Sequence, residues 1–326
     1  MDSINVGARF SVVIVNYNGG SMLLECVLSA VLEGVPTSQI IVVDNGSHDD
    51  SIRSLETNIP GTQIIRNHCN AGFARAVNQG IRAAKGEFIL LLNNDALLQP
   101  RALLEFAGVF DDLPNLAIAG GQLHYPDGRL QSAFAPLPSF AEEILPLFLL
   151  KLIWPDRFRR KTLDKSPLAV DSVLGACLCT RSSVLPRLGL LDEDYFFFFE
   201  EIDWCRRAWQ IGASVFYLPT ARAIHRGGHT ANRFRGPARV EYQRSKLTFF
   251  RKSRGTATFL AVSSVLVIRT LINALSGTVI NAATLCLNPR LRLKAGTYWY
   301  LSCWHLLFRP SSWGLPGKCH RRDGEI

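Results

Sequence analysis

Four phenylalanines lead directly into three carboxylates within residues 190–207 (LLDEDYFFFFEEIDWCRR). The carboxylates belong to Glu200, Glu201 and Asp203. Apolar walls keep water away from a carboxylate and raise its pKa toward neutrality, where the group serves as a general base. The alternative is a buried strand followed by a helix whose acidic first turn suits the helix dipole. The segment fits both interpretations, so the rest of the chain has to separate them.

Two further carboxylates each follow an apolar run. Asp44 ends the run QIIVVD, and Asp95 comes shortly after EFILLL. A carboxylate after so apolar a run is costly unless it is paired or bound to a metal. Mg²⁺ and Mn²⁺ take oxygen ligands and share them with substrate phosphates. Asp44 suits hydrogen bonds to a nucleotide, as the second-strand acid does in dinucleotide folds.

His225, in the segment AIHRGGHT, adds a candidate imidazole ligand for a metal near Asp95. A single histidine is also common as a hydrogen-bonded structural residue, and that alternative stays open. No GxGxxG motif precedes Asp44, which disfavours a dehydrogenase. Together these residues predict a site for a metal and a diphosphate.

Alternating strands and helices have to position these side chains. Residues 10–16 (FSVVIVN), 39–44, 63–66 and 87–92 are predicted strands, and residues 21–32 and 72–84 are predicted helices with apolar side chains at helical spacing. Strands that alternate with helices indicate βαβ units and a mostly parallel sheet. Ligands bind at the carboxyl ends of such strands, where Asp44 and Asp95 both fall. Beyond Pro100 the pattern loosens, with further strands predicted at 117–125 and 171–180.

The charge of the chain is divided unevenly. Through Asp203 there are 16 Lys and Arg against 24 Asp and Glu, whereas from Trp204 onward there are 20 against 3. The acidic part suits metal binding, and the basic part calls for an anionic partner. Nucleic acid is one candidate. An anionic membrane with a phosphorylated lipid is favoured because apolar segments flank the basic residues.

Two apolar segments carry that membrane prediction. Residues 144–154 (ILPLFLLKLIW) are too few to span a bilayer and precede the basic run 157–161, as in a segment that lies on anionic lipid. A core helix with a basic end is the alternative. Residues 256–287 contain one charged side chain, Arg269. One or two helices in the membrane interface are expected there, with a hairpin that enters the bilayer or a soluble helical bundle as rivals.

The ends and the cysteines give weaker indications. The first residues lack a basic segment followed by an apolar one, so no signal peptide is evident. Eight cysteines without a CxxC pair favour free thiols in a reducing compartment. The tail after Arg309 is rich in Pro, Gly and charge, which predicts disorder.

Six motifs in order give the chain a resemblance to a known family: SVVIVNYN, VDNGSHDDS, NAGFARAVNQGI, LLLNNDA, the long segment from VLGACLCT to RRAWQIG, and IHRGGHT. They resemble family 2 glycosyltransferases of GT-A fold, and most of all the rhamnosyltransferase branch that extends bacterial cell-surface glycans. The resemblance covers about residues 10–254. It implies an inverting transfer from a nucleotide-diphosphate sugar, assisted by Mg²⁺ or Mn²⁺, with dTDP-L-rhamnose as the expected donor.

The resemblance also implies roles for individual residues. Asp95 matches the last acid of a metal-binding D-x-D motif, and His225 matches the downstream ligand. The first acid of that motif is Asn93 here, which implies an ion held largely through the donor diphosphate. The implied donor-site residues are Asn16, Asn18, Asp44, Asn45, Asn70, Gly72, Phe73, Asn78, Asn94 and Asp95.

The usual Glu-Asp pair of the family reads Glu200-Glu201, so Glu201 is the expected general base. Asp203 is the rival base, although its spacing before Arg206 and Arg207 fits an ion pair on a helix. The expected domains are a GT-A domain (1–240), a basic, apolar helical region that associates with the membrane (241–310) and a disordered tail (311–326). The acceptor is expected to be a glycan or a lipid-linked sugar at the cytoplasmic face of the inner membrane.

Three alternatives remain at this point. The first is a UDP-hexose-dependent transferase of the same fold. The second is a relative that binds a nucleotide sugar without catalysing transfer. The third is a basic nucleic-acid-binding protein, although no nucleic-acid motif is present and no such partner is expected.

Overall fold

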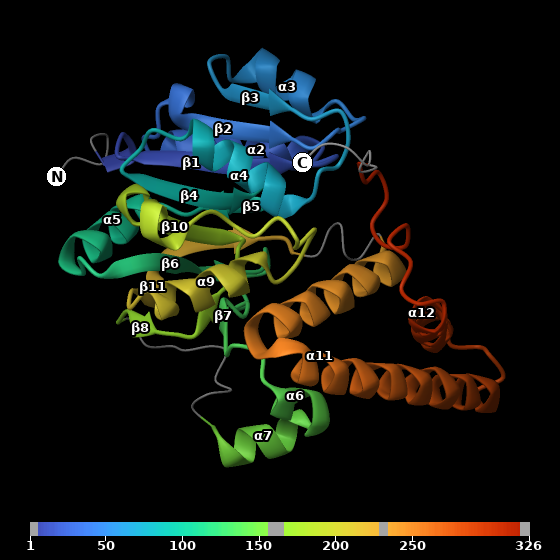
Figure 1. Cartoon of the computed structure of the whole chain (residues 1–326). Helices are drawn as coiled ribbons and strands as arrows, with labels where there is room; N and C mark the ends of the chain where they lie inside the picture. The colour runs from blue at the N-terminus through green and yellow to red at the C-terminus, as the bar shows by residue number, and fades with distance from the viewer. Residues whose placement is uncertain (1–5, 156–165, 228–233, 320–326) are drawn as a thin grey trace, which may run out of the picture.

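One curled sheet forms the centre of the computed structural model, which describes residues 6–155, 166–227 and 234–319 (Figure 1). Strand β1 (Phe10–Asn16) lies between β2 (Ile40–Asp44) and β4 (Phe88–Asn93) and runs parallel to both. Strand β3 (Gln63–Arg66) pairs in parallel with β2 at the edge. The parallel arrangement predicted for this part of the chain is confirmed, and β2 and β4 end at Asp44 and Asn93.

The other half of the sheet is mixed. Strand β10 (Cys177–Arg181) runs antiparallel to both β4 and β6 (Leu116–His124). The long strand β11 (Ser214–His225) is parallel to β6, and β5 (Ala96–Leu98) pairs antiparallel with its end. The turn between β4 and β5 therefore brings Asp95 next to His225.

Short strands complete this half. Strand β8 (Leu168–Ala169) pairs with β11, and β7 (Phe134–Ala135) forms a separate two-stranded sheet with β9 (Ser172–Val173). The single strand expected at 171–180 is thus wrong, because β9 and β10 belong to different sheets. The break between them, at Leu174, Gly175 and Ala176, lines the cavity described below.

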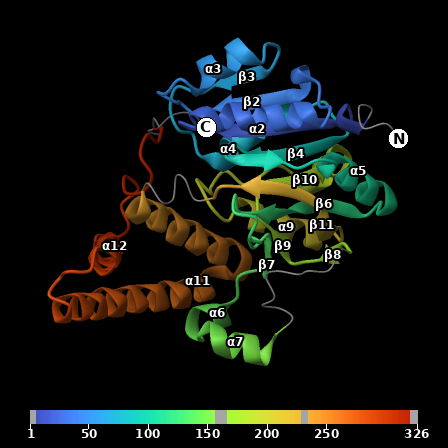
Figure 2. The same cartoon turned by 180° about the vertical axis from the view of Figure 1, so that it is seen from behind.

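Helices cover both faces of the sheet, with α2 and α4 on opposite sides (Figures 1 and 2). Helix α4 buries Val77 and Ile81, four residues apart, and its Gly80 leaves room for Val13 of β1. The helices of this domain are α2 (Ser21–Leu32), α3 (Ser51–Asn58), α4 (Phe73–Ala83), α5 (Ala102–Asp112), α8 (Leu185–Leu188) and α9 (Glu200–Gln210).

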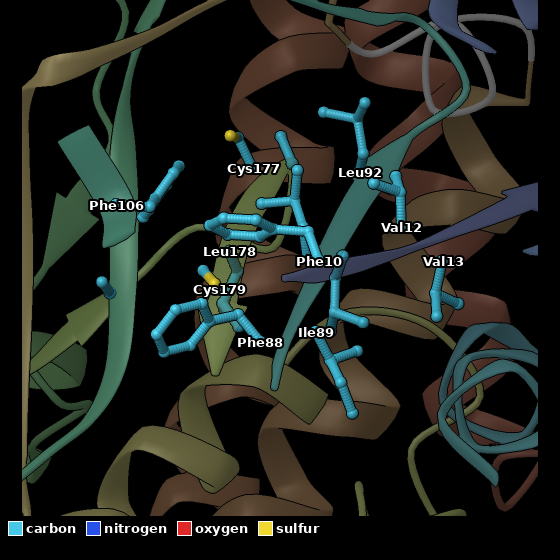
Figure 3. Packing of buried hydrophobic residues seen from close by; sticks show 14 of the residues in the cluster. Phe10, Val12, Val13, Phe88, Ile89, Leu92, Phe106, Cys177, Leu178 and Cys179 are labelled. Atoms are coloured by element: carbon cyan, nitrogen blue, oxygen red, sulfur yellow. The ribbon is translucent and has the colours of Figure 1, made fainter. Parts of the chain in front are cut away.

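The core joins the two halves of the sheet (Figure 3). The ring of Phe88 on β4 lies 5.2 Å from that of Phe10 on β1 and 5.0 Å from that of Phe110 on α5. Cys177 and Cys179 on β10 are buried thiols in this core. Burial on both faces explains why β1, β2 and β4 read as continuous apolar runs.

The C-terminal helices form a separate hairpin. Helix α11 (Arg235–Ala283) bends at Gly255, whose φ of 80° only glycine adopts readily, and α12 (Pro289–Leu306) packs back against it. The first part of α11 lies against the domain built on the central sheet, and the second part extends away from it (Figure 1). Among the described helices, α11 alone is long and apolar enough to cross a membrane.

Helices α6 (Phe140–Ile144) and α7 (Leu147–Ile153) form the apolar segment that was expected at 144–154. Glu143 of α6 is buried and binds two cations of α11, with Lys246 Nζ at 2.6 Å and Arg269 Nη2 at 3.1 Å. The side chains of Phe148 and Leu152 are mostly exposed. The basic run 157–161 lies outside the described residues.

The described part of the tail, residues 310–319, packs against the rest of the chain, which corrects the expected disorder after Arg309 for this part. Its Leu315 is buried, and the backbone N–H of Asn70 donates to Gly317 O at 2.9 Å. A disulfide joins Cys319 to Cys69, which corrects the expectation of free thiols for these two residues. The cause is tertiary: the tail crosses from α12 to the loop after β3, and this brings together two cysteines 250 residues apart.

Candidate active site

A cavity of about 270 Å³ lies at the carboxyl ends of β1 and β4. Its walls come from the β4–β5 turn, the loop before α4, the break between β9 and β10, and the start of α9. Among the residues implicated by the sequence, it brings together Asn45, Asn70, Phe73, Asn94, Asp95, Glu200, Glu201 and His225.

The wall that the resemblance assigns to the donor, called the donor side from here on, is built from asparagine side chains that bind one another. Asn45 Nδ2 donates to Asn70 Oδ1 at 2.9 Å, and Asn70 Oδ1 also accepts from Gly72 N at 3.1 Å. Asn45 Oδ1 accepts from Ala71 N at 3.1 Å. These bonds fix the loop before α4, as buried amides require.

Asn16 and Asp44 form a second polar group just behind this wall. Asn16 Nδ2 donates to Asp44 Oδ1 at 3.1 Å, and Asn94 Nδ2 donates to Asn16 Oδ1 at 3.1 Å. Asn18 Oδ1 accepts from His48 N at 2.8 Å and so holds the loop after β2. Asp44, Asn16 and Asn18 therefore support the loops around the cavity, and none of the three lines it.

Gly72 is required where the donor loop meets the phenylalanine run. Its φ is 93°, and a Cβ there would lie 2.9 Å from the ring of Phe196. The next residue, Phe73, donates its backbone N–H to Phe196 O at 2.7 Å. The loop before α4 and the segment before α9 are thus held together at one point.

Asp95 and His225 face each other across the β4–β5 turn. Asp95 Oδ1 lies 3.3 Å from His225 Nε2, and Gly227 N donates to Asp95 Oδ2 at 3.2 Å. Burial opposes ionisation of Asp95, but the hydrogen bond and charge of His225 outweigh it and hold the pKa of Asp95 below its ordinary value.

This pair has the chemistry of a partial metal site. His225 Nδ1 lies 2.7 Å from Gln131 Oε1, an atom that only accepts, so Nδ1 carries the proton. With that proton on Nδ1, Nε2 of His225 faces Asp95 Oδ1, and these two atoms can share either a proton or a metal ion. Within the described residues no group of three His, Cys, Asp or Glu side chains gathers here. Two protein ligands fit an ion that takes its remaining ligands from water and a diphosphate.

The other wall carries the carboxylate pair, Glu200 and Glu201. Phe198 and Phe199, just before them, have φ values of 70° and 72°, a strained conformation for side chains of this size. The turn directs the start of α9 into the cavity. One oxygen of each glutamate, Glu200 Oε2 and Glu201 Oε2, is buried without a hydrogen-bond partner. Buried polar atoms left unpaired are costly and mark a site where a ligand supplies the partner.

Burial raises the pKa of both carboxyls. The charge of Glu201 raises the pKa of Glu200 further, whereas the backbone N–H of Gly175 favours the ionised form of Glu201. Glu200 is 4% exposed, and Glu201 is more open to solvent. Of the two, Glu201 therefore loses its proton first and is the better base.

Asp203 has a different environment from the carboxylate pair. Its Oδ1 accepts from Arg206 Nη2 at 2.7 Å and its Oδ2 from Arg207 Nε at 2.9 Å. Its side chain is buried and does not line the cavity. The ion pair expected from the spacing is present, and both oxygens are occupied.

Asn78 also lies away from the cavity. Its Nδ2 donates to Leu191 O at 2.8 Å, and its Oδ1 accepts from Leu191 N at 3.0 Å, so it fastens α4 to the segment that leads to α9. Sequence reasoning missed Tyr17 and Leu315 in the cavity wall and Gln131 behind His225. Tyr17 directly follows β1, and the carboxyl ends of parallel strands are where ligands bind, so its place in the cavity could have been predicted from the sequence. Leu315 and Gln131 carried none.

The fold and this site define a class: an enzyme of GT-A type that transfers glycosyl groups. The family model "Glycosyl transferase family 2" matches residues 11–185. The chain belongs to that family and is a glycosyltransferase. It is 25% identical over 238 residues to an N-acetylglucosaminyl-diphospho-decaprenol L-rhamnosyltransferase of Mycobacterium tuberculosis, covering 68% of this chain and 77% of the relative.

Solved structures support the same fold. A mannosyltransferase from Pyrobaculum calidifontis, solved with GDP-Man and Mn²⁺, matches with a TM-score of 0.50 and 15% identity over 93% of this chain and 88% of its own. GalNAc-T7, solved with UDP, GalNAc and Mn²⁺, has a TM-score of 0.50 and 17% identity over 66% of this chain. The match spans 43% of the GalNAc-T7 chain. The predicted GT-A fold is confirmed.

Proposed function

We propose that this glycosyltransferase moves a sugar from a nucleotide-diphosphate donor to a lipid-linked acceptor, with inversion at the anomeric carbon and with help from a divalent metal. One observation carries the proposal: Glu201, with an unpaired buried oxygen, shares a cavity with the Asp95–His225 pair. An acceptor hydroxyl needs a base on one side of the sugar, and the diphosphate needs an electrophilic partner on the other.

Glu201 performs the proton transfer in this mechanism. Its carboxylate takes the proton of the acceptor hydroxyl while that oxygen forms a bond to the anomeric carbon. The bond from this carbon to the diphosphate breaks on the opposite face, so the configuration inverts. Mg²⁺ or Mn²⁺ held by Asp95 and His225 would offset charge on the departing nucleoside diphosphate. The phenylalanine run keeps water from the reacting groups.

We assign the donor as dTDP-L-rhamnose and the acceptor as a lipid diphosphate sugar. The name of the Mycobacterium tuberculosis relative specifies both rhamnosyl transfer and a diphospho-decaprenol acceptor. The apolar length of α11 and the exposed side chains of α7 suit an enzyme that works at a membrane surface. The enzyme then acts in synthesis of bacterial cell-surface polysaccharide, at the cytoplasmic face of the inner membrane.

A screen of nucleotide sugars tests this assignment. Melting temperatures are measured with dTDP-L-rhamnose, UDP-galactose and UDP-N-acetylglucosamine, each with Mg²⁺, Mn²⁺ or EDTA. A ligand that binds the native state stabilises it in proportion to the logarithm of its concentration. We expect dTDP-L-rhamnose with metal to give the largest increase. A larger increase with a UDP sugar would overturn the choice of donor, and binding without transfer or donor hydrolysis would overturn catalysis.

A further inference from the structure

A second cavity, of about 860 Å³, lies between the two parts of α11 and the first half of α12. We call it the basic cavity because six cationic side chains line it. They are Arg235, Arg239, Lys246, Arg269, Arg290 and Lys294.

The positive charge of the basic cavity is only partly balanced. Glu143 binds Lys246 and Arg269. In the part of the chain that the structure describes, no ion pair joins the other four cations to a carboxylate, and Glu143 is the acid that meets the lining residues. These four cations are exposed to solvent, and together they create a positive potential at the cavity that attracts an anion.

The remaining walls of the basic cavity are largely apolar and aromatic. Leu266, Leu293 and Leu301 line it, together with the rings of Tyr242 and Tyr298. A ligand that fits such walls has an anionic head and an apolar body. A free inorganic ion would leave the apolar walls unused.

Phe198 connects the basic cavity with the active site. Its side chain lines both cavities, and its ring packs edge-on against Tyr242 with centroids 5.6 Å apart. Phe198 lies three residues before Glu201. A phosphate held in the basic cavity therefore belongs to a molecule whose sugar end can extend toward the base.

Exposed apolar side chains continue outward from the basic cavity. Ile272, Leu275 and Val279 follow Arg269 along α11, and all three are more than half exposed. Arg269 is the one charged residue in this stretch, and it lines the basic cavity. Charge near the active site and apolar surface beyond it match the order of groups in a lipid phosphate.

We propose that the basic cavity binds the phosphate groups of the lipid-linked acceptor, an isoprenyl-type diphosphate ester, and so places its sugar beside Glu201. The identification of this ligand as the acceptor rests on the proposed function. The phosphate site itself rests on the cations, the apolar walls and the shared residue Phe198. The donor diphosphate is separate, because it is assigned to Asp95 and His225 in the other cavity.

The test compares side chains on one helix. Arg290 and Lys294 line the basic cavity from α12, four residues apart, whereas Arg292 between them does not line it, and all three residues are exposed to solvent. No ion pair involves any of the three within the described residues, so their replacement leaves the fold intact. The variants are the double change R290Q/K294Q and the control R292Q, each made in the full chain in detergent.

Binding is measured by titration calorimetry with farnesyl diphosphate, farnesol and inorganic pyrophosphate, without nucleotide sugar. We expect R290Q/K294Q to weaken farnesyl diphosphate binding about tenfold or more, because two charged groups that would contact the phosphates are lost. R292Q should leave it within about twofold. Unchanged affinity in R290Q/K294Q, or an equal loss in R292Q, would overturn the proposal.

Two further measurements separate the sources of phosphate. Pyrophosphate should bind more weakly than farnesyl diphosphate, and pyrophosphate of equal or higher affinity would indicate a site for a free anion and overturn the proposal. Binding to phosphatidylglycerol vesicles should fall no more in R290Q/K294Q than in R292Q. A selective loss in the double variant would assign the cavity to bulk headgroups instead.

The outcome for the cavity can be distinguished from that for the proposed function. Farnesyl diphosphate binding that depends on Arg290 and Lys294, without transfer from any nucleotide sugar, would contradict the proposed function and leave the phosphate site in place. Transfer that is intact in R290Q/K294Q at limiting acceptor concentration would contradict the proposed role of the basic cavity and leave the proposed function in place.

Discussion

The donor side and the carboxylate side of the active-site cavity differ in how their polar groups are satisfied. On the donor side, Asn45 and Asn70 bind each other, and both accept backbone N–H groups of the loop before α4. On the carboxylate side, Glu200 and Glu201 each keep a buried oxygen without a partner. The donor side is thus organised before any ligand binds, whereas the carboxylate side stores a cost that an acceptor hydroxyl can relieve.

The backbone shows the same difference. The donor side rests on the ends of parallel strands, and its left-handed positions are Asn18, Gly46 and Gly72, residue types that adopt this conformation readily. The carboxylate side depends instead on two successive phenylalanines in a left-handed conformation. Strain of this kind persists where the surrounding packing fixes it. Here Phe199 is buried against Phe249 of α11, with ring centroids 5.9 Å apart. The helical hairpin therefore helps to hold Glu201, the proposed base, in place.

The largest expected effect is on the carboxylate side. Glu201→Gln should lower kcat by about 10²–10⁴ because a general base is lost, and donor affinity should stay within about twofold. Steady-state kinetics and titration with the donor measure the two quantities. Glu200→Gln is the matched control and should lower kcat far less. A greater loss of kcat in Glu200→Gln than in Glu201→Gln would identify Glu200 as the base. Wild-type turnover in Glu201→Gln would contradict the assignment of Glu201 as the general base.

A smaller effect is expected on the donor side, where two aspartates have different roles. Asp95→Asn should weaken donor binding in Mn²⁺ by about tenfold or more, because loss of a residue that merely hydrogen-bonds to a metal ligand already lowers metal affinity by about that factor. Donor binding in EDTA should hardly change. Asp44→Asn should weaken binding by the same factor in both conditions. Calorimetry with and without metal measures this. Equal metal dependence in wild type and Asp95→Asn would contradict the ligand role of Asp95.

The smallest expected effect is on the free energy of unfolding. It tests whether burial of the Glu200–Glu201 pair destabilises the folded protein. Burial raises the pKa of Glu200, so the folded protein binds this proton more tightly than the unfolded chain does. Between the ordinary glutamate pKa and the raised folded value, the free energy of unfolding then falls as pH rises. Glu200→Gln removes the titrating carboxyl and with it this decrease in the free energy of unfolding. Its melting temperature should approach wild type at low pH and exceed it by a few degrees near neutrality.

Thermal melts at several pH values between 4 and 8 measure this difference. Glu105→Gln on α5 is a suitable control, because Glu105 lies outside both cavities and its replacement should give no pH-dependent gain. A constant difference between Glu200→Gln and wild type across the range would show that the Glu200 carboxyl is not held protonated by the fold.

Sequence alone predicted the part of the site that strand ends determine. Asp44 and Asp95 follow apolar runs, and parallel strands place their carboxyl ends at one edge, so their approximate position followed from local patterns. His225 was a candidate imidazole ligand from its residue type, the resemblance supported it, and β11 brings it to the β4–β5 turn. The environment of Asp203 was also foreseen, because an ion pair to Arg206 and Arg207 depends on helical spacing.

The remainder depended on contacts between distant segments. Asn78 matched a donor-site motif, but its side chain points to the backbone of Leu191, a direction that the motif does not specify. Leu315 reaches the cavity only because the tail returns past α12, and the pairing of Cys69 with Cys319 has the same origin. The Pro and Gly content of the tail predicted disorder. Composition does not show that a distant part of the chain binds the tail, so this prediction was wrong for the described part.

The returning tail has a consequence for the order in which the enzyme is completed. A chain is synthesised from its N-terminus, and the segments that contain Asp44 and Asp95 emerge first. The hydrogen bond from Asn70 to Gly317 and the disulfide to Cys319 form only after α11 and α12 have been made. The loop beside the donor is therefore fastened last, by residues that follow the apolar hairpin. A nascent chain gains its finished sugar-nucleotide pocket only once the segment that would bring it to the lipid already exists.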